Sequence, residues 1–245
     1  MGEYNVPGLD RKLSGEWNYW LSSQDRLKKG KAEREAWLRF EVQFIAGLVY
    51  RATKLVLAPS TRVLQIGAGP VDVIDFFPPC EKHAIDPLAD RYKQLFRDYQ
   101  DSSVKYIKGV GEQLPYENDY FDFVVVRNAL DHVYDPAKVL REIRRVLKPN
   151  GILYVWIHLY DRKTSIAYRI LNAVTRYFET EPWAFTLGRI KALLRGGGFQ
   201  ICHPACIEER ENEKLAASTL KGKIASLLVA PKHPTGYACA LKVHK

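Results

Sequence analysis

The sequence predicts an α/β fold with a mostly parallel, seven-stranded sheet, flanking helices, extra N-terminal helices and a late insertion. Three observations lead to this prediction. From Thr61 onward, short β-branched segments alternate with longer segments of helical spacing, which is typical of parallel strands joined by crossover helices. A glycine-containing turn follows the first of these strands. The chain has 245 residues, of which 47% are hydrophobic, and this suits one elaborated globular domain.

Seven segments carry strand-like patterns, and they define the expected sheet. In chain order they are residues 62–66, 82–85, 104–108, 121–127, 152–158, 199–206 and 237–243. We expect one or two helices over 31–57, one beginning near Val71, and further helices over 90–99, 137–147, 165–178 and 187–194. The clearest boundary is Asp135-Pro136, an N-cap followed by proline at the first helical position.

The expected domain organisation follows from this order of elements. Residues 1–60 form an N-terminal helical segment that we expect to cover the ligand crevice, and residues 61–245 form the main domain. Within it, residues 61–160 make a ligand-binding core, and residues 161–245 supply later helices and the last strands. An insertion is expected over about 208–235, which is first charged and then apolar.

The net charge of +9 is unevenly distributed. Residues 61–160 hold 13 Lys and Arg against 14 Asp and Glu, so the rest of the chain carries +10. Such a surplus can attract an anionic ligand, nucleic acid or an acidic membrane surface, or it can serve solubility alone. The charge therefore leaves the class of partner open.

Composition also bears on compartment and metal binding. No apolar run approaches the roughly 20 residues of a membrane-spanning helix, and the polar N-terminus lacks a signal-peptide core, so we expect a cytoplasmic protein. The four cysteines are too few and too scattered for a disulfide framework. Cys202 and Cys206 flank His203 like a metal pair, but no second pair stands at zinc spacing, so no metal is expected.

Two features of the core point to a ligand with a ribose. Gly67 and Gly69 follow the first strand, where glycine lets the backbone turn sharply and approach a ligand. Asp86 ends the second strand, 19 residues after Gly67, and a carboxylate there can accept hydrogen bonds from both ribose hydroxyls. The third glycine of the dinucleotide fingerprint is absent, because Asp72 stands at its position.

Further motifs downstream bring a resemblance to a known family. They are Glu112-Gln-Leu-Pro115, Phe121-Asp122, Asp131-His132-Val133, Asp135-Pro136 and the run from Leu140 to Gly151. In order and spacing they resemble the class I S-adenosylmethionine-dependent methyltransferases, in particular the small-molecule branch with ubiquinone and sterol methyltransferases. The resemblance covers about residues 60–158 and implies a Rossmann-like fold, S-adenosylmethionine as cofactor and S-adenosylhomocysteine as product.

The resemblance also implies positions for the cofactor-binding residues. Toward the methionine part these are Gln65, Gly67, Ala68, Gly69, Asn128 and Ala129, and toward the nucleoside they are Asp86, Pro87, Gly111 and Glu112. Three positions depart from the family pattern. Gln65 stands where the family usually has an acid, Val71 where it has glycine, and Val110 where it commonly has aspartate. The first and third changes remove expected contacts, so they predict weaker cofactor binding or a loss of activity.

Methyl transfer to a hydroxyl needs a base, and the strand ends offer candidates. His132 and Asp131 follow the fourth strand, and we rank His132 first because imidazole can accept a proton near neutral pH. Cofactor-side and structural roles for this histidine stay open. The residues expected on the acceptor side are His158, Tyr160, Trp183 and Phe185, although Trp183 and Phe185 are more often used for apolar packing.

Three functions therefore remain. The favoured one is methyl transfer to a small molecule or glycan precursor, which the basic flanks favour as anionic. The second is RNA methylation, which those flanks also permit, although the sequence has no aromatic and basic stacking motif and no appended RNA module. The third is a catalytically silent binding protein on the same fold. The sequence determines neither the acceptor nor the oligomeric state.

Overall fold

The computed structural model describes residues 9–175, 182–208 and 235–243, and its strands form one sheet. The strands are β1 (Arg62–Ile66), β2 (Glu81–Asp86), β3 (Lys105–Lys108), β4 (Phe121–Arg127), β5 (Leu147–Leu159), β6 (Phe199–Glu208) and β7 (Thr235–Val243). Their order is β3-β2-β1-β4-β5-β7-β6. The first five pair in parallel, whereas β7 runs antiparallel to both β5 and β6. The predicted α/β class with a mostly parallel sheet is confirmed.

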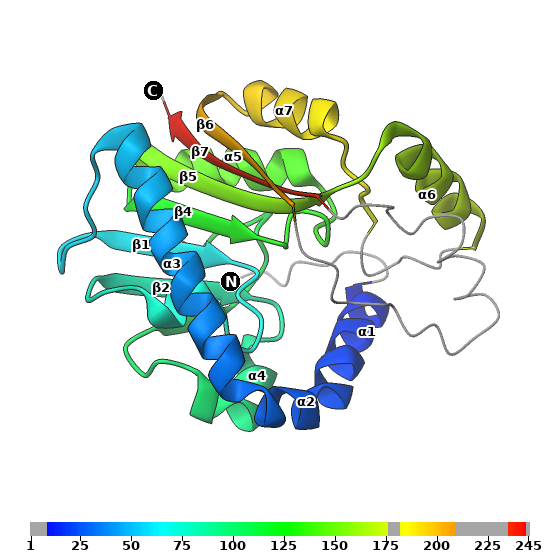
Figure 1. The fold of residues 1–245 in the computed structure, drawn as a ribbon, viewed down its shortest axis with the longest axis horizontal. Coiled ribbons are helices and arrows are strands. Elements are labelled where there is room, and N and C mark those ends of the chain that lie inside the picture. Colours follow the sequence, from blue (N-terminus) through cyan, green and yellow to red (C-terminus); the bar gives the residue numbers. More distant parts are fainter. Residues whose placement is uncertain (1–8, 176–181, 209–234, 244–245) are drawn as a thin grey trace.

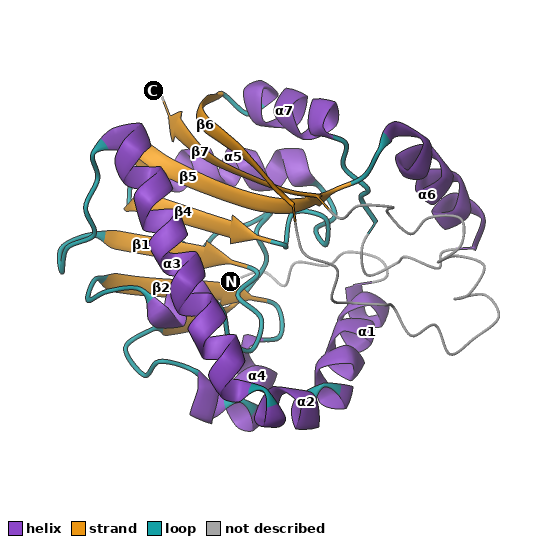
Figure 2. Cartoon of the chain, in the orientation of Figure 1, coloured by secondary structure: helices purple, strands orange, loops and turns teal. Residues whose placement is uncertain are grey.

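Helices cover both faces of this sheet (Figures 1 and 2). The helices of the described residues are α1 (Leu9–Ser22), α2 (Gln24–Lys29), α3 (Lys31–Thr53), α4 (Ala89–Leu95), α5 (Pro136–Val146), α6 (Arg162–Thr175) and α7 (Leu187–Gly196), with short 3₁₀ turns η1 (Val73–Phe76) and η2 (Arg97–Tyr99). The predicted Asp135 cap is present, since its side chain accepts a hydrogen bond from the Lys138 amide at 2.9 Å. Two further helices, α1 and α2, precede the one predicted over 31–57, and the helix predicted over 90–99 is split into α4 and η2.

The helix predicted from Val71 is wrong, because only the four-residue turn η1 follows the glycine turn. Pro78 and Pro79 come soon after it, and the residue before a proline is pushed out of the helical region. Phe77 accordingly has an extended backbone with ψ of 149°. The Asp72 side chain caps η1, and the Asp75 side chain reciprocates. The long helix α3 takes over that face of the sheet.

The core consists of two apolar layers, one on each face of the sheet. One layer packs α5 and α7 against β1, β4 and β5, and the other packs α3 and η1 against the opposite face of the same strands. A smaller cluster joins α1 to α4. Most of the insertion predicted over 208–235 lies outside the described residues. Within the part of the chain that the structure describes, no helix is both long and apolar enough to cross a membrane.

Candidate functional site

The glycine turn after β1 lies against the chain that leaves β4. Gly67 and Gly69 have positive φ angles of 67° and 59°, which L side chains rarely adopt. A Cβ on Gly67 would lie 2.4 Å from the Cβ of Ala129, so any side chain there would collide. This close approach at the carboxyl ends of neighbouring parallel strands is where open α/β sheets form their ligand crevice. Glycine is therefore required at residue 67 by both conformation and space.

Asp86 sits at the tip of β2 with its carboxylate directed to the same turn. One oxygen accepts the Gly69 amide at 3.0 Å, and the other accepts the Leu88 amide at 2.8 Å. Burial raises the pKa of Asp86 to about 6, although the two amide hydrogen bonds oppose that change. The predicted acid thus stands next to the predicted glycine turn, and its charge is costly in this position.

The loop after β4 carries four predicted site residues. Asn128 has a left-handed backbone with φ of 46°, which turns the chain sharply at the end of the strand. Ala129 packs on Gly67, as described above. Asp131 is buried, and its Oδ1 has no hydrogen-bond partner among the described residues. His132 is partly exposed, and its Nδ1 lies 3.8 Å from a carboxylate oxygen of Glu16 in α1. The loop therefore brings two ionisable groups to the crevice.

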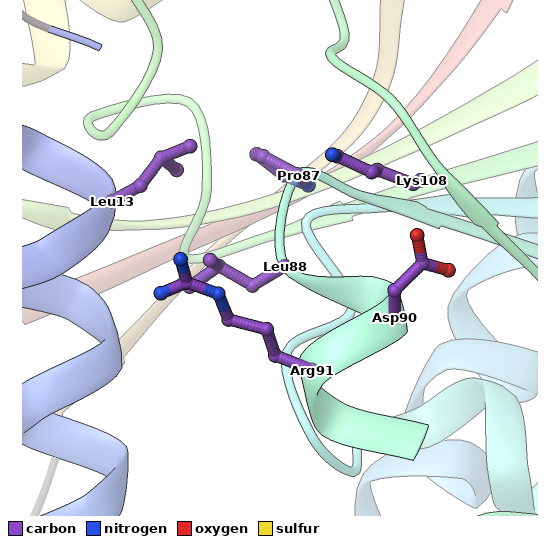
Figure 3. Close-up of a pocket in the computed structure, with 6 residues that line it drawn as sticks. All are labelled: Leu13, Pro87, Leu88, Asp90, Arg91 and Lys108. Carbon is purple, nitrogen blue, oxygen red and sulfur yellow. The ribbon is translucent and has the colours of Figure 1, made fainter. Parts of the chain in front are cut away.

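The residues predicted near the nucleoside divide into two groups. Pro87 borders a cavity of about 140 Å³, which is also lined by Leu88, Asp90, Arg91, Lys108 and Leu13 of α1 (Figure 3). Glu112, in contrast, is buried, and its Oε1 accepts the amides of Tyr134 and Asp135 at 2.8 and 3.3 Å. Its neighbour Gly111 is packed against the sheet, since a Cβ there would lie 3.1 Å from Ile66. In the structure, Glu112 therefore joins the loop after β3 to the loop after β4.

Helix α1, part of the N-terminal segment expected to cover the crevice although no helix was placed before residue 31, lies across these strand ends (Figure 1). Leu13, Trp17 and Trp20 pack on Leu88, Tyr92 and Phe96, the cluster that joins α1 to α4. On the other side, Lys12 lies 4.8 Å from the ring centroid of Tyr134, beyond β4. Trp20 also lies 3.7 Å from the position of a Cβ on Gly69. The spacing of Leu13, Trp17 and Trp20, four and then three residues apart, is the helical signal that could have located this element.

Gln65 does not line the crevice with a charged or exposed group. Its side chain is fully buried, and its Oε1 accepts the Ile74 amide of η1 at 3.0 Å. Sequence reasoning also missed the ion cluster beside η1. There the buried Arg127 side chain contacts Asp72 at 3.1 Å and Glu41 of α3 at 3.6 Å. These contacts tie α3 to the segment that follows the glycine turn, so Gln65 and Arg127 support the turn from beneath.

The four residues predicted on the acceptor side are mostly engaged in packing. His158 lies edge-on to Trp156 with centroids 4.6 Å apart, and Tyr160 packs on Tyr168 at 5.5 Å. Phe185 is buried in the core beneath α7. Trp183 is partly exposed and donates its indole N–H to the Val133 carbonyl at 2.8 Å. Trp183 therefore holds the loop that contains His132, and packing is the role that the structure describes for Phe185.

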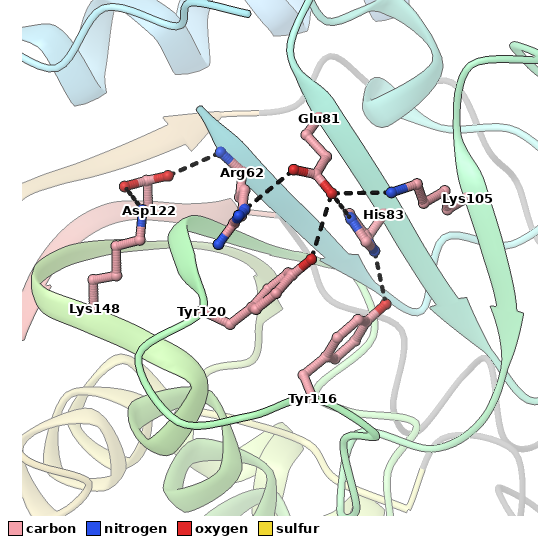
Figure 4. A network of polar contacts seen from close by, with 8 residues as sticks. All are labelled: Arg62, Glu81, His83, Lys105, Tyr116, Tyr120, Asp122 and Lys148. Carbon is pink, nitrogen blue, oxygen red and sulfur yellow. Dashed lines mark hydrogen bonds and ion pairs between the residues drawn. The ribbon is translucent and has the colours of Figure 1, made fainter. Parts of the chain in front are cut away.

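The opposite end of the sheet carries a second polar network (Figure 4). Glu81, at the start of β2, accepts hydrogen bonds from Arg62 at 3.1 Å and Lys105 at 3.0 Å, and it contacts His83 at 3.1 Å. The Lys105 ammonium, followed by His83, lowers the pKa of Glu81 to about 2. Burial lowers the pKa of His83, whose other ring nitrogen contacts the Tyr116 hydroxyl. Because two cations, on β1 and β3, hold the Glu81 carboxylate between them, this network is a structural clamp.

Known proteins resemble the chain most in its core. Residues 64–155 match the family model described as a methyltransferase domain. The thiol S-methyltransferase TMT1B of Rattus norvegicus is 32% identical over 43% of this chain and 46% of its own length. The ubiquinone/menaquinone biosynthesis C-methyltransferase UbiE of Vibrio vulnificus is 36% identical over 40% of this chain and 41% of its own length. The matched part thus spans less than half the length of either relative.

A similarity to solved structures extends over more of the chain. The YcgJ protein from Bacillus subtilis superimposes with a TM-score of 0.62 at 18% identity, and the match covers 82% of this chain and 98% of that one. At that level of identity the likeness concerns the fold alone. The fold is therefore shared over more of the chain than the segment that the sequence relatives match.

Proposed function

We propose that the chain is a class I S-adenosylmethionine-dependent methyltransferase of the small-molecule branch, as the match of residues 64–155 supports, and that it methylates a small molecule. The observation that carries the proposal is the pairing of Asp86 with the glycine turn. Both lie at carboxyl ends of adjacent strands and are joined by the hydrogen bond from the Gly69 amide to the carboxylate. A ribose bound there would meet a ready acceptor for its hydroxyls.

The residues at the strand ends suit S-adenosylmethionine chemically. Asp86 would hold the ribose hydroxyls, Pro87 would lie beside the adenine, and the bare backbone from Gly67 to Gly69 would pass beneath the methionine part. When bound, the cofactor supplies a methyl group that a nucleophile can accept in line. The cavity next to Pro87, about 140 Å³, is smaller than the roughly 300 to 1,000 Å³ of typical ligand pockets. Full entry of the cofactor would therefore require α1 to shift.

His132 is the proposed proton acceptor when the acceptor molecule is a hydroxyl or thiol. It lies on the loop after β4, partly exposed, with Glu16 on one side and the buried Asp131 next to it in the chain. Asp131 is the alternative base, because one of its oxygens has no hydrogen-bond partner among the described residues. Trp183 would act indirectly, by fixing the Val133 carbonyl in the same loop.

The acceptor is proposed to lie beyond the carboxyl ends of β4 and β5, where His158, Tyr160 and Trp183 border it. The basic flanks favour an acceptor that carries phosphate or carboxylate, either a small molecule or a glycan precursor. Residues 1–60 are proposed to cover the crevice, which the contacts of α1 support, and residues 161–245 to shape the acceptor side. Arg162 and Lys163 at the start of α6 are exposed and available to such an anion.

Calorimetric titration with S-adenosylhomocysteine tests the cofactor part. We expect binding by the natural chain, and a several-fold to hundredfold weaker affinity for Asp86→Ala, because hydrogen bonds to a charged group are worth roughly 1.5 to 3 kcal/mol. Asp98→Ala is the matched control, since Asp98 is an exposed acid of η2 that does not line the cavity beside Pro87. Equal affinities of the natural chain and Asp86→Ala would remove Asp86 from the ribose role, and tight binding of a nicotinamide cofactor instead would overturn the proposed function.

A methyl-transfer screen against small-molecule and RNA fractions tests the acceptor part. Transfer to the small-molecule fraction is expected, whereas transfer to RNA would favour the RNA methyltransferase, and cofactor binding without transfer would favour a silent binding protein. For an anionic acceptor, kcat/KM should fall as salt rises, because charge attraction is screened over roughly 8 to 10 Å near physiological salt. A flat salt response, together with full activity of the variant carrying Arg162→Glu and Lys163→Glu, would indicate an uncharged acceptor.

A further inference from the structure

Glu16 occupies a central place over the candidate crevice. It lies one helical turn before Trp20, the side chain that approaches Gly69, and its Oε1 accepts the Trp20 indole N–H at 2.8 Å. Its second oxygen lies 3.8 Å from His132. Its negative charge also reaches Asp86, whose pKa it helps to raise. One carboxylate from α1 therefore stands between the β2 tip, the glycine turn and the loop after β4.

A carboxylate in this place matters because residue 65 lacks one. Gln65 stands where the resemblance leads us to expect an acid, and its oxygen is already used by the Ile74 amide. The side chain is fully buried and uncharged, so it cannot neutralise a cation in the crevice. Glu16 is about 30% exposed on its side chain and therefore accessible to a ligand. Asp86 and Asp131 also carry carboxylates here but are buried, whereas Glu16 is partly exposed and has the right charge for a cationic ligand group.

We propose that Glu16 supplies the carboxylate that faces the cationic methionine end of S-adenosylmethionine, the task that Gln65 cannot perform. The inference rests on the proposed function, because it presumes that this cofactor occupies the crevice. It assigns to α1 a direct part in cofactor recognition in addition to covering the site. Such an attraction exists only when both Glu16 and the ligand group are charged. It can therefore be measured by removing the charge from Glu16 or from the ligand.

Glu16→Gln removes the charge and keeps the shape and the oxygen that accepts the Trp20 indole. Calorimetry would compare three ligands: S-adenosylmethionine with its sulfonium and ammonium, S-adenosylhomocysteine with the ammonium alone, and 5′-methylthioadenosine with neither. We expect about a three- to tenfold loss of affinity for S-adenosylmethionine, as for a partly exposed ion pair, and no change for 5′-methylthioadenosine. If S-adenosylhomocysteine loses affinity to the same extent, Glu16 faces the ammonium. If it loses none, Glu16 faces the sulfonium. Either result supports the proposal.

Glu33→Gln, the same change at an exposed position of α3, is the matched control and should leave all three affinities unchanged. An equal loss for all three ligands would overturn the proposal, because it would mean that Glu16 acts on the nucleoside or on folding. Unchanged or tighter binding of S-adenosylmethionine would also overturn it, since α1 would then only occupy the crevice. If the natural chain binds none of the three ligands, the proposed function fails together with this inference.

Discussion

The two ends of the sheet from β1 to β4 differ in the surroundings of their carboxylates. At the amino end, Glu81 is surrounded by Arg62, Lys105 and His83, and its pKa is lowered to about 2. At the carboxyl end, Asp86 is buried beside another acid, Glu16, and its pKa is raised to about 6. The nearby Asp131 has a buried oxygen with no partner among the described residues. The Glu81 carboxylate is paired with cations, whereas the Asp86 carboxylate is held by two backbone amides.

The difference separates a structural role from a binding role. A paired carboxylate stabilises the fold whenever it is ionised, whereas a buried, poorly paired carboxylate lowers the stability of the ionised fold. Such costs persist in proteins mainly where a ligand later meets the unsatisfied group. This contrast explains why His83, although it is surrounded by polar groups, is a poorer candidate for chemistry than His132.

The largest expected effect comes from closing the glycine turn at the carboxyl end. Gly67→Ala combines a positive φ with a Cβ 2.4 Å from Ala129, so we expect a loss of about 2 to 4 kcal/mol in the free energy of unfolding and loss of cofactor binding. Chemical denaturation and calorimetry measure the two effects.

Two variants give this prediction its controls. When Ala129→Gly is added to the Gly67→Ala protein, the stability lost through collision of the two Cβ atoms should be recovered. The stability lost through backbone strain should remain lost. Gly188→Ala, in α7 with nothing within 4 Å of its new Cβ, should change stability little or raise it by about 0.5 kcal/mol. A Gly67→Ala protein as stable as the natural chain would contradict the geometry of the turn.

The next effect in size concerns the pH dependence of cofactor binding. The ribose hydroxyls are held best by an ionised Asp86, whose pKa is raised to about 6, so affinity should fall as pH drops through that value. At pH 5 only about a tenth of the carboxyl would be ionised, which predicts about tenfold weaker binding of S-adenosylhomocysteine than at pH 7.5. Calorimetry at the two pH values measures it. Asp86→Asn should bind weakly with little pH dependence, and an equally steep dependence in that variant would assign the titration to another group.

A smaller effect is expected at the amino end, where the pKa of Glu81 is lowered and not raised. Glu81→Gln should lower the free energy of unfolding at pH 7 by about 1 kcal/mol, a reduced figure because about 30% of the Glu81 side chain is exposed. Because the folded pKa lies below the ordinary 4.5, the stabilisation is full above pH 4.5 and is lost as pH falls toward about 2. The difference between variant and natural chain should shrink over that window, and a constant difference would show that packing is responsible.

The smallest effect tests the contact between the segment before α7 and the loop after β4. Trp183→Phe keeps the ring stacked on Phe185 but loses the hydrogen bond to the Val133 carbonyl, so we expect a loss of about 0.5 to 1 kcal/mol. Thermal unfolding measures the loss. An unchanged unfolding midpoint would mean that water replaces the indole at the carbonyl.

Local patterns were enough to predict most of the fold. The β-branched run from Phe121 to Arg127 is β4 as predicted, and Asp135-Pro136 begins α5 as predicted, because both signals act within one element. The glycine turn and Asp86 were also predicted, since their spacing in the chain fixes their places at adjacent strand ends. The false helix near Val71 shows the limit of this reasoning, because Pro78 and Pro79 end the helical segment after the single turn η1.

Contacts between distant elements were beyond local reasoning. The network of Glu81 depends on the register of β1 against β2 and β3, which pairs Arg62 with Glu81 and sets His83 opposite Lys105. Glu16 reaches the crevice only because α1 docks on α4, about seventy residues later in the chain. The burial of Gln65 on the α3 face likewise depends on packing. Neither composition nor spacing contains these facts.

The place of β7 in the sheet has a consequence for how the chain is synthesised. β7 lies between β5 and β6, yet its residues, 235–243, are translated after both. Until they leave the ribosome, β6 has no neighbouring strand in the described sheet, and one edge of β5 stays unpaired. Such edges readily pair with other chains. A nascent chain stalled before residue 235 should therefore depend on chaperones, whereas one released after residue 243 can complete its own sheet.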